Sequence, residues 1–198
     1  MTTEQKELMS EFEIIKSMIE RTRQNTVDRG AFFLLWGYLV FFANISTFIC
    51  LTIHREEYVW IPWAVLMPLG AIVSIILVFR YRKNEQYKSY VEQASHSVWI
   101  ACGIAFLIVG FIGPYSFKID HTIINPMIAL LAGIGVFASG GIMEWNPLRI
   151  GGLFLFAGVV FMLFTPANLH PLIMAIVIIP GYLVPGYMLK NKYKPVDK

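Results

Sequence analysis

Residues 125–164 read NPMIALLAGIGVFASGGIMEWNPLRIGGLFLFAGVVFMLF, in which two apolar runs flank the polar break Glu144-Trp145-Asn146-Pro147. Each run has about the 17–25 residues that an α-helix needs to cross a bilayer. A connection this short joins helices that are antiparallel neighbours. The stretch therefore predicts a transmembrane helical hairpin.

The composition of the whole chain extends this interpretation. Of its 198 residues, 57% are hydrophobic and only 15% are charged, which is typical of membrane proteins rather than soluble domains. We expect an all-α polytopic membrane protein with six transmembrane helices arranged as three helical hairpins. The predicted transmembrane domain is residues 31–189, with spans at 31–53, 58–79, 97–113, 122–143, 147–165 and 171–189.

Residues 1–30 precede the first span and have a different pattern. Large apolar side chains recur there with the spacing of one helix face, at Leu8, Phe12, Ile15 and Ile19, and charged residues fill the opposite face. This predicts an amphipathic cytoplasmic helix. Its apolar face could pack on the membrane domain or on lipid, or it could form a homodimer or bind a protein partner. The polar start of the chain predicts no cleavable signal peptide.

The positive charges predict the orientation of the spans. Of the 16 Lys and Arg residues, 14 fall in segments on one side of the membrane, and only Arg55 and Lys118 fall on the other. Because cytoplasmic segments carry the excess of Lys and Arg, we expect both termini in the cytoplasm and the protein in the bacterial inner (cytoplasmic) membrane. Trp63 is then expected at the outer interface and Trp99 at the inner one.

Two cytoplasmic segments of this topology are strongly basic. The first follows the second span directly and carries Arg80, Arg82, Lys83 and Lys88, and the second is the basic tail, residues 190–198. Basic residues that adjoin a span bind anionic lipid headgroups. We therefore expect these segments to contact the bilayer surface and no nucleic acid.

The predicted spans contain essentially no ionisable side chain near mid-membrane, although such residues usually mark function there. Their absence weighs against an ion-coupled transporter and a charge-lined channel. The main interior polar residues are expected to form hydrogen bonds between helices, and they are Asn44, Ser46, Thr47, Ser74 and Ser139. No nucleotide-binding, metalloprotease or serine-hydrolase motif occurs, so we expect no enzyme activity and no cofactor.

Small or polar residues recur in the odd-numbered spans with a spacing of seven, and each such pair is followed by a proline at the start of the next span. The pairs are Gly37/Asn44, Gly103/Gly110 and Gly151/Gly158, and the prolines are Pro62, Pro126 and Pro171. The pattern indicates either three degenerate copies of one hairpin or only the general abundance of Gly and Pro in membrane helices.

Three of the four histidines, His54, His121 and His170, fall at the outer ends of predicted spans. They are either ordinary interfacial residues or, if the hairpins share an axis, weak candidates for metal ligands. Cys50 and Cys102 fall at opposite membrane depths, too far apart for a disulfide, and are expected to be free thiols.

The last span contains PGYLVPGY, in which Pro180-Gly181 and Pro185-Gly186 lie five residues apart. Each proline removes a backbone donor, so the helix must kink or unwind. Broken helices line substrate sites in transporters, but plain kinks near a helix end are also common.

The run GAFFLLWGYLVFFANI after the N-terminal helix, together with GGIMEWNPLRIGGLFLF, resembles uncharacterised six-span bacterial inner-membrane proteins. The resemblance covers most of the chain and implies no activity. The lack of charges within the spans and the apolar face of the N-terminal helix instead favour a non-enzymatic interaction or regulatory membrane protein. The alternative is a small permease for an uncharged or apolar substrate, which would use the broken sixth helix.

Overall fold

The computed structural model describes residues 30–82, 90–116 and 121–191, and within these ranges it contains helices and no strands. Six of the helices are long and apolar enough to cross a membrane: Gly30–Thr52, Glu56–Phe79, Gln93–Tyr115, Thr122–Ile142, Asn146–Leu163 and Ala167–Asn191. The prediction of an all-α chain with six such helices is confirmed. The predicted N-terminal helix lies outside the described residues, and the arrangement in three hairpins stays a prediction.

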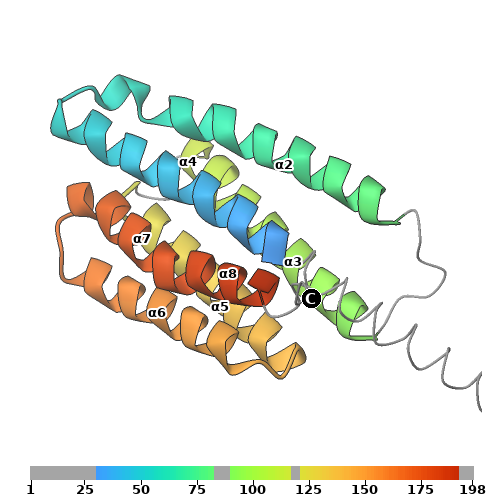
Figure 1. Ribbon diagram of the computed structural model, residues 1–198. Coiled ribbons are helices and arrows are strands. Elements are labelled where there is room, and N and C mark those ends of the chain that lie inside the picture. Colours follow the sequence, from blue (N-terminus) through green and yellow to red (C-terminus); the bar gives the residue numbers. More distant parts are fainter. Residues whose placement is uncertain (1–29, 83–89, 117–120, 192–198) are drawn as a thin grey trace, which may run out of the picture.

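The spans are built from the following elements, which Figure 1 shows in chain order. The first helix, Gly30–Thr52, is followed by the 3₁₀ turn η1 (Glu56–Tyr58) and by α2 (Trp60–Arg82). The third span consists of α3 (Tyr90–Leu107), η2 (Ile108–Ile112) and α4 (Gly113–Tyr115). The fourth and fifth are α5 (His121–Ile142) and α6 (Asn146–Leu163). The last span consists of η3 (Ala167–Leu169), α7 (His170–Ile178), η4 (Ile179–Leu183) and α8 (Val184–Asn191).

Residues 80–96, which lie between the second and third predicted spans, are partly helical in the described part of the chain. The α2 helix continues to Arg82 and α3 already begins at Tyr90, seven residues before the predicted start of the third span. Residues 90–96 read YVEQASH and contain neither Gly nor Pro, so nothing in them stops a helix. A membrane helix need not end where the hydrocarbon ends, so this helix begins before the span predicted from hydropathy.

Two helices end in a residue other than Gly with a left-handed backbone, His54 (φ 55°) and Glu144 (φ 49°). At both ends a backbone N–H closes the last turn onto a carbonyl five residues earlier, from Arg55 to Cys50 at 2.9 Å and from Trp145 to Gly140 at 2.9 Å. This is the position that most helices give to Gly, because a Cβ is strained there.

Replacing Glu144 with Gly should therefore raise the free energy of unfolding by about 0.5–1 kcal/mol, since it relieves that strain. Unfolding in mixed SDS micelles, followed by circular dichroism, measures the change. His54→Gly at the other turn should shift the midpoint in the same direction. A lower midpoint for both variants would contradict the left-handed assignment.

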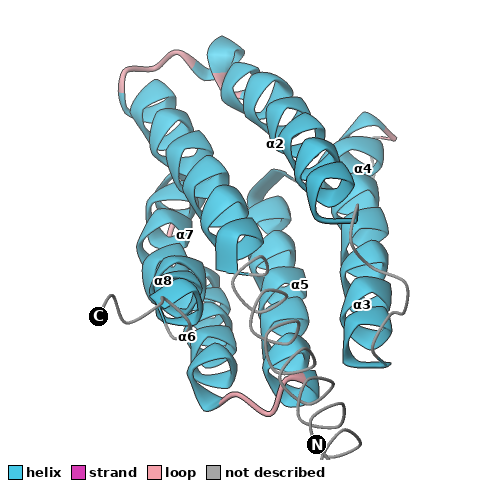
Figure 2. Ribbon diagram, turned by 45° about the vertical axis from the view of Figure 1, so that its right-hand side comes forward, coloured by secondary structure: helices cyan, strands magenta, loops and turns pink. Residues whose placement is uncertain are grey.

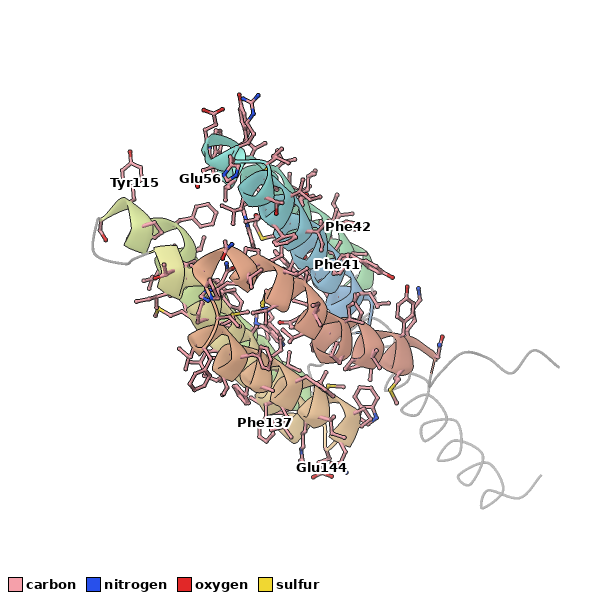
Figure 3. The ribbon with its side chains drawn as sticks, turned by 90° about the vertical axis from the view of Figure 1, so that its left-hand side faces the viewer. Phe41, Phe42, Glu56, Tyr115, Phe137 and Glu144 are labelled. Carbon is pink, nitrogen blue, oxygen red and sulfur yellow. The ribbon has the colours of Figure 1, made fainter. Side chains whose placement is uncertain are left out.

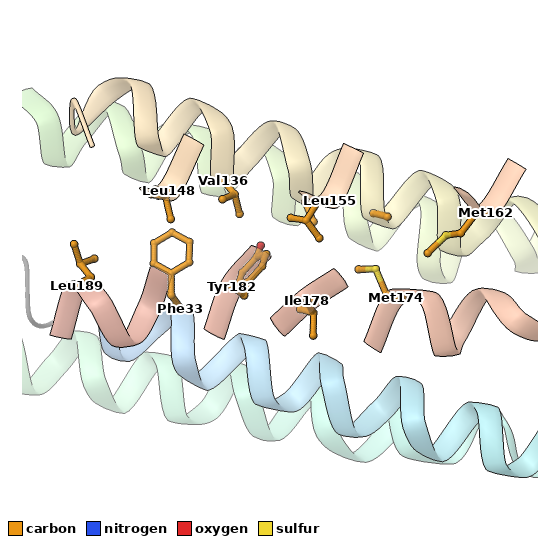
Figure 4. Close-up of a cluster of buried hydrophobic side chains, with 11 residues drawn as sticks. Phe33, Val136, Leu148, Leu155, Met162, Met174, Ile178, Tyr182 and Leu189 are labelled. Atoms are coloured by element: carbon orange, nitrogen blue, oxygen red, sulfur yellow. The ribbon is translucent and has the colours of Figure 1, made fainter. Parts of the chain in front are cut away.

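The buried core lies between α5, α6, the last span and the N-terminal part of the first helix. Its α6 residues recur every seven positions, and side chains from α7, η4 and α8 face them across the interface (Figure 4). The cluster consists of Phe33, Ala129, Ala132, Val136, Leu148, Leu155, Met162, Met174, Ile178, Tyr182 and Leu189. A spacing of seven keeps side chains on one face of a helix, so α6 presents a continuous ridge to its neighbours.

Glycines bring α5 and α6 close together. A Cβ added at Gly140 would lie 2.6 Å from the backbone nitrogen of Arg149, and one added at Gly152 would lie 2.8 Å from Cβ of Phe137. A Cβ at Gly133 would lie 2.6 Å from the ring of Phe156. Helices in lipid associate through such close packing rather than through hydrophobic burial, so these positions require Gly.

The α2 and α3 helices lie on the outside of the bundle (Figure 2). In the most apolar stretch of Glu56–Phe79 only 6% of the residues are buried, and in that of Gln93–Tyr115 only 17%. The corresponding shares are 44% for Thr122–Ile142 and 50% for Ala167–Asn191. The second and third spans therefore contact few other helices, and most of their apolar surface is exposed.

Candidate functional site

The Pro-Gly segment of the last span does not interrupt the helix. It forms the π-helical turn η4, with Pro180 near its start and Gly181, Tyr182 and Leu183 buried. The carbonyl oxygen of Gly181 would lie 2.7 Å from a Cβ added at Gly151 of α6, and Leu155 packs against Gly181. The π-helical turn is therefore pressed directly against α6.

The second Pro-Gly pair is also packed. Pro185 and Gly186 are buried in α8. Side-chain atoms of Leu34 and Phe33 would lie 3.1 and 3.3 Å from a Cβ added at Gly186, and Cγ of Pro185 would lie 3.0 Å from one added at Gly151. The four residues predicted as a helix break thus form contacts with the first helix and α6. Whether this turn has a function stays a prediction.

Three tryptophans form hydrogen bonds from one helix to a hydroxyl on another. The indole Nε1 of Trp36 donates to Oγ of Ser74 at 3.1 Å, that of Trp63 to Oγ1 of Thr47 at 2.9 Å, and that of Trp99 to Oγ of Ser139 at 3.0 Å. The interhelical hydrogen bonds expected of the three hydroxyls are thus present, but their tryptophan donors were not foreseen.

Trp99 also joins three spans through ring contacts. Its ring centroid lies 5.8 Å from that of Phe33 and 6.1 Å from that of Tyr182, and the latter two are 5.6 Å apart. The expectation of an interfacial role for Trp63 and Trp99 missed these inward contacts. A usable signal was the shared Gly-x-x-x-Ser spacing of Gly70/Ser74 and Gly135/Ser139, which leaves room for a large ring beside a hydroxyl.

Asn44 is fully buried in the first helix. Its Nδ2 donates to the carbonyl of Val40 in the same helix at 2.8 Å, and its Oδ1 has no hydrogen-bond partner among the described residues. A buried acceptor without a donor costs stability. The hydrogen bond that Asn44 makes is within its own helix, unlike the interhelical one expected from the sequence.

His170 is buried where α5, α6 and α7 meet at one end of the bundle. Its Nδ1 lies 3.1 Å from the carbonyl oxygen of Thr122, and its Nε2 lies 3.1 Å from that of Thr165. Pro126 has no N–H to donate to the Thr122 carbonyl four residues earlier, so the imidazole can supply a donor there. A neutral imidazole carries one N–H, so His170 donates to one of these two backbone carbonyls, and the tautomer decides which.

The other two histidines are placed as follows. His54 is exposed in the turn after the first helix, and His121 is the first residue of α5, with its side chain outside the described part of the chain. Among the described residues, no group of three His, Cys, Asp or Glu side chains could hold a metal ion. The structure thus gives His170 another role, and it brings no described ligand set together.

Charged side chains of the described spans lie toward the ends of the bundle, as Glu56 and Glu144 show at opposite ends in Figure 3. Arg149 does not pair with Glu144. Its Nε instead donates to the carbonyl of Gly140 at 3.2 Å, and its Nη2 lies 3.5 Å from that of Gly141. A cation at the C-terminus of a helix satisfies unpaired carbonyls and the helix dipole, so Arg149 caps α5.

The remaining candidates fall largely outside the described residues. Leu8, Phe12, Ile15 and Ile19, together with Lys83, Lys88 and residues 192–198, are outside the described ranges. Arg80 and Arg82 lie in the last turn of α2, and Lys190 is exposed near the end of α8.

Comparison with known proteins finds no match for this chain among family models, among curated proteins or among solved structures.

Proposed function

We propose that this chain is a non-enzymatic interaction or regulatory protein of the bacterial inner membrane, with both termini in the cytoplasm. In this proposal the six helices form three hairpins that anchor the protein. The N-terminal helix presents Leu8, Phe12, Ile15 and Ile19 to a partner, while the basic segments, Arg80 to Lys88 and the tail, contact anionic headgroups. The charge asymmetry of the sequence supports this orientation.

One observation carries the preference for binding over transport. A permease that used the broken sixth helix would need space beside Pro180-Gly181, because substrate sites in transporters lie where unwound backbone lines a cavity. Here the Gly181 carbonyl faces Gly151, and Leu155 covers Gly181. Close packing at this point supports a static anchor.

The permease remains the second candidate, for a substrate that is uncharged or apolar. Two observations favour it. The third and sixth spans each contain a π-helical segment, η2 and η4, and such segments are frequent at functional sites. The buried Oδ1 of Asn44 has no donor among the described residues and would accept a hydrogen bond from a polar substrate group.

Replacing Phe12 and Ile15 together with Glu should abolish co-purification of a partner after mild solubilisation, while the protein still inserts and folds. Burial of two such side chains contributes roughly 3–6 kcal/mol before the costs of association, which is enough for a specific and reversible contact. The matched control is Phe12→Leu with Ile15→Leu, which keeps the apolar face and should retain the partner.

The competing variant is Pro180→Ala with Pro185→Ala. If the glutamate variant behaves like wild type and the alanine variant abolishes uptake of a solute into proteoliposomes, the interaction proposal is wrong and the permease replaces it.

A further inference from the structure

One packing arrangement occurs twice in the first four spans. In the first copy, Trp36 lies across Gly70 and donates to Ser74. A Cβ added at Gly70 would lie 3.3 Å from Cη2 and 3.4 Å from Cζ3 of the indole. In the second copy, Trp99 lies across Gly135 and donates to Ser139. The corresponding distances from a Cβ at Gly135 are 3.3 and 3.5 Å.

The correspondence includes the residues around the two indoles. The third residue after each tryptophan, Leu39 or Cys102, also packs on the glycine, with Leu39 Cδ1 at 2.5 Å and Cys102 Sγ at 3.1 Å from the added Cβ. With Gly70 aligned to Gly135, the pairs Ala64/Ala129, Leu66/Leu131 and Ser74/Ser139 are also identical. The α2 helix therefore occupies, beside the first helix, the place that α5 occupies beside α3.

The two equivalent helices, α2 and α5, differ in what covers the helix face that lies beside their Gly and Ser residues. On α5 this face is formed by Ala129, Gly133, Val136 and Gly140, and it packs against α6. Gly133 contacts Phe156, and Gly140 contacts the backbone of Arg149, so α6 runs antiparallel to α5. Ala129 and Val136 are completely buried there.

On α2 the equivalent positions are Ala64, Pro68, Ala71 and Ile75, and all four are exposed. The next face around the helix is also exposed but bulky, with Val65, Leu69, Ile72 and Ile76. Lipid chains accept bulky side chains, whereas close helix packing needs small ones. The face at Ala64, Pro68 and Ala71, called here the α2 outer face, is the one on which α5 binds a helix. Ile75 stands where α5 has Gly140, so the closest approach falls in the first half of α2.

We propose that two copies of this chain form a two-fold symmetric dimer in the membrane, in which the α2 outer face of each packs against α3 of the other. The required complement is a helix that runs antiparallel to α2, as α6 does to α5, and that has an open face. The α3 helix runs antiparallel to α2 (Figure 1), and only 17% of the most apolar stretch of its span is buried. A Cβ added at Gly103 meets no atom within 4 Å, and one at Gly110 meets only Ile128 at 4.0 Å.

A second copy fits both open surfaces at once. Two-fold symmetry pairs α2 of each chain with α3 of the other, and such isologous dimers are the commonest oligomers. A single helix of another protein on α2 would leave the glycines of α3 uncovered. This dimer does not depend on the N-terminal helix, so Phe12→Glu with Ile15→Glu should leave it intact, and the failure of one proposal is distinguishable from that of the other.

The first test counts subunits. Full-length protein with one fluorophore per chain is reconstituted in liposomes over a range of protein-to-lipid ratios, and photobleaching steps are counted. Wild type should show two steps per particle at higher ratios. Ala64→Leu with Ala71→Leu should weaken dimerisation at least tenfold, whereas the matched change on the bulky face, Val65→Leu with Ile76→Leu, should not. A wild type that is monomeric at every ratio, or equal dimerisation by both variants, overturns the proposal.

The second test identifies the contact without relying on destabilising changes. Two differently tagged copies, one with Ala71→Cys and the other with Gly103→Cys, are co-expressed in a background with Cys50→Ser and Cys102→Ala. Oxidation in the membrane should link the two tags. Two results would overturn the pairing of α2 with α3. One is that the two tags are not linked, and the other is that two copies carrying Ala71→Cys are linked to each other.

Discussion

Replacing Gly140 with Ala should lower the free energy of unfolding by about 2–3 kcal/mol, whereas the same change at the next residue, Gly141, should leave it unchanged or slightly higher. At Gly140 the new methyl would lie 2.6 Å from the backbone nitrogen of Arg149 and 3.1 Å from the carbonyl carbon of Leu148. Backbone cannot rotate away, so α6 must shift, and overpacking of this kind costs about 1–3 kcal/mol or more.

Gly141 is the matched control because a Cβ there meets no atom within 4 Å. Ala is favoured over Gly in a helix by up to about 1 kcal/mol, which sets the direction of the small expected effect. SDS titration of both variants in the same detergent, followed by circular dichroism, gives the difference between them. Equal midpoints would contradict the close contact of α5 with α6.

Replacing Trp99, which is half-buried, with Ala should lower the free energy of unfolding by about 3 kcal/mol, the low end of the range for removing a core aromatic side chain. The indole is the group through which α3 contacts Ser139 on α5, Phe33 on the first helix and Tyr182 on the last span. Its loss leaves a gap beside Gly135 and removes the donor to a buried hydroxyl, so α3 should separate from the bundle more readily than in the wild type.

Two variants divide this effect into its parts. Trp99→Phe keeps most of the ring but removes the donor, and should cost less, because one hydrogen bond between membrane helices contributes about 0.6 kcal/mol on average and at most about 1.7. Trp36→Ala removes the equivalent indole from the first helix, but its partner helix α2 has only 6% of its apolar stretch buried. We therefore expect a smaller loss than at Trp99. A loss at Trp36 that equals or exceeds the loss at Trp99 would mean that α2 contributes more to stability than its burial indicates.

Several features of the chain were predictable because the bilayer imposes them. The spans follow from runs of about 20 apolar residues, and helices follow because every backbone polar group must be satisfied within the lipid. The turn at Glu144 and the hydrogen bonds to Thr47, Ser74 and Ser139 were also within reach of the sequence. Hydroxyl groups between membrane helices have few partners other than the neighbouring helices.

The significance of individual glycines was not predictable. Gly37, Gly151 and Gly158 contact the last span, through Leu183, Pro185 and Val177 respectively, but Gly103 of the same spacing pattern meets no atom within 4 Å. The odd-numbered spans thus share a spacing without sharing a contact. The arrangement that does recur, of Trp36 with Gly70 and of Trp99 with Gly135, joins residues more than 30 positions apart. The Gly-x-x-x-Ser spacing marks the receiving helix, but it does not say which tryptophan packs on it.

The sequence by itself determined the membrane class, the helical state and the approximate positions of six spans, because these depend only on length and polarity along the chain. The tertiary structure decided which face of each helix is buried, why Gly140 differs from Gly141, and why the half-buried ring of Trp99 contacts the first and last spans. The physical reason is the solvent. In water a helix shows its buried face as an apolar stripe, but in lipid every face is apolar, and the buried one is defined only by the shape of the neighbour that packs on it.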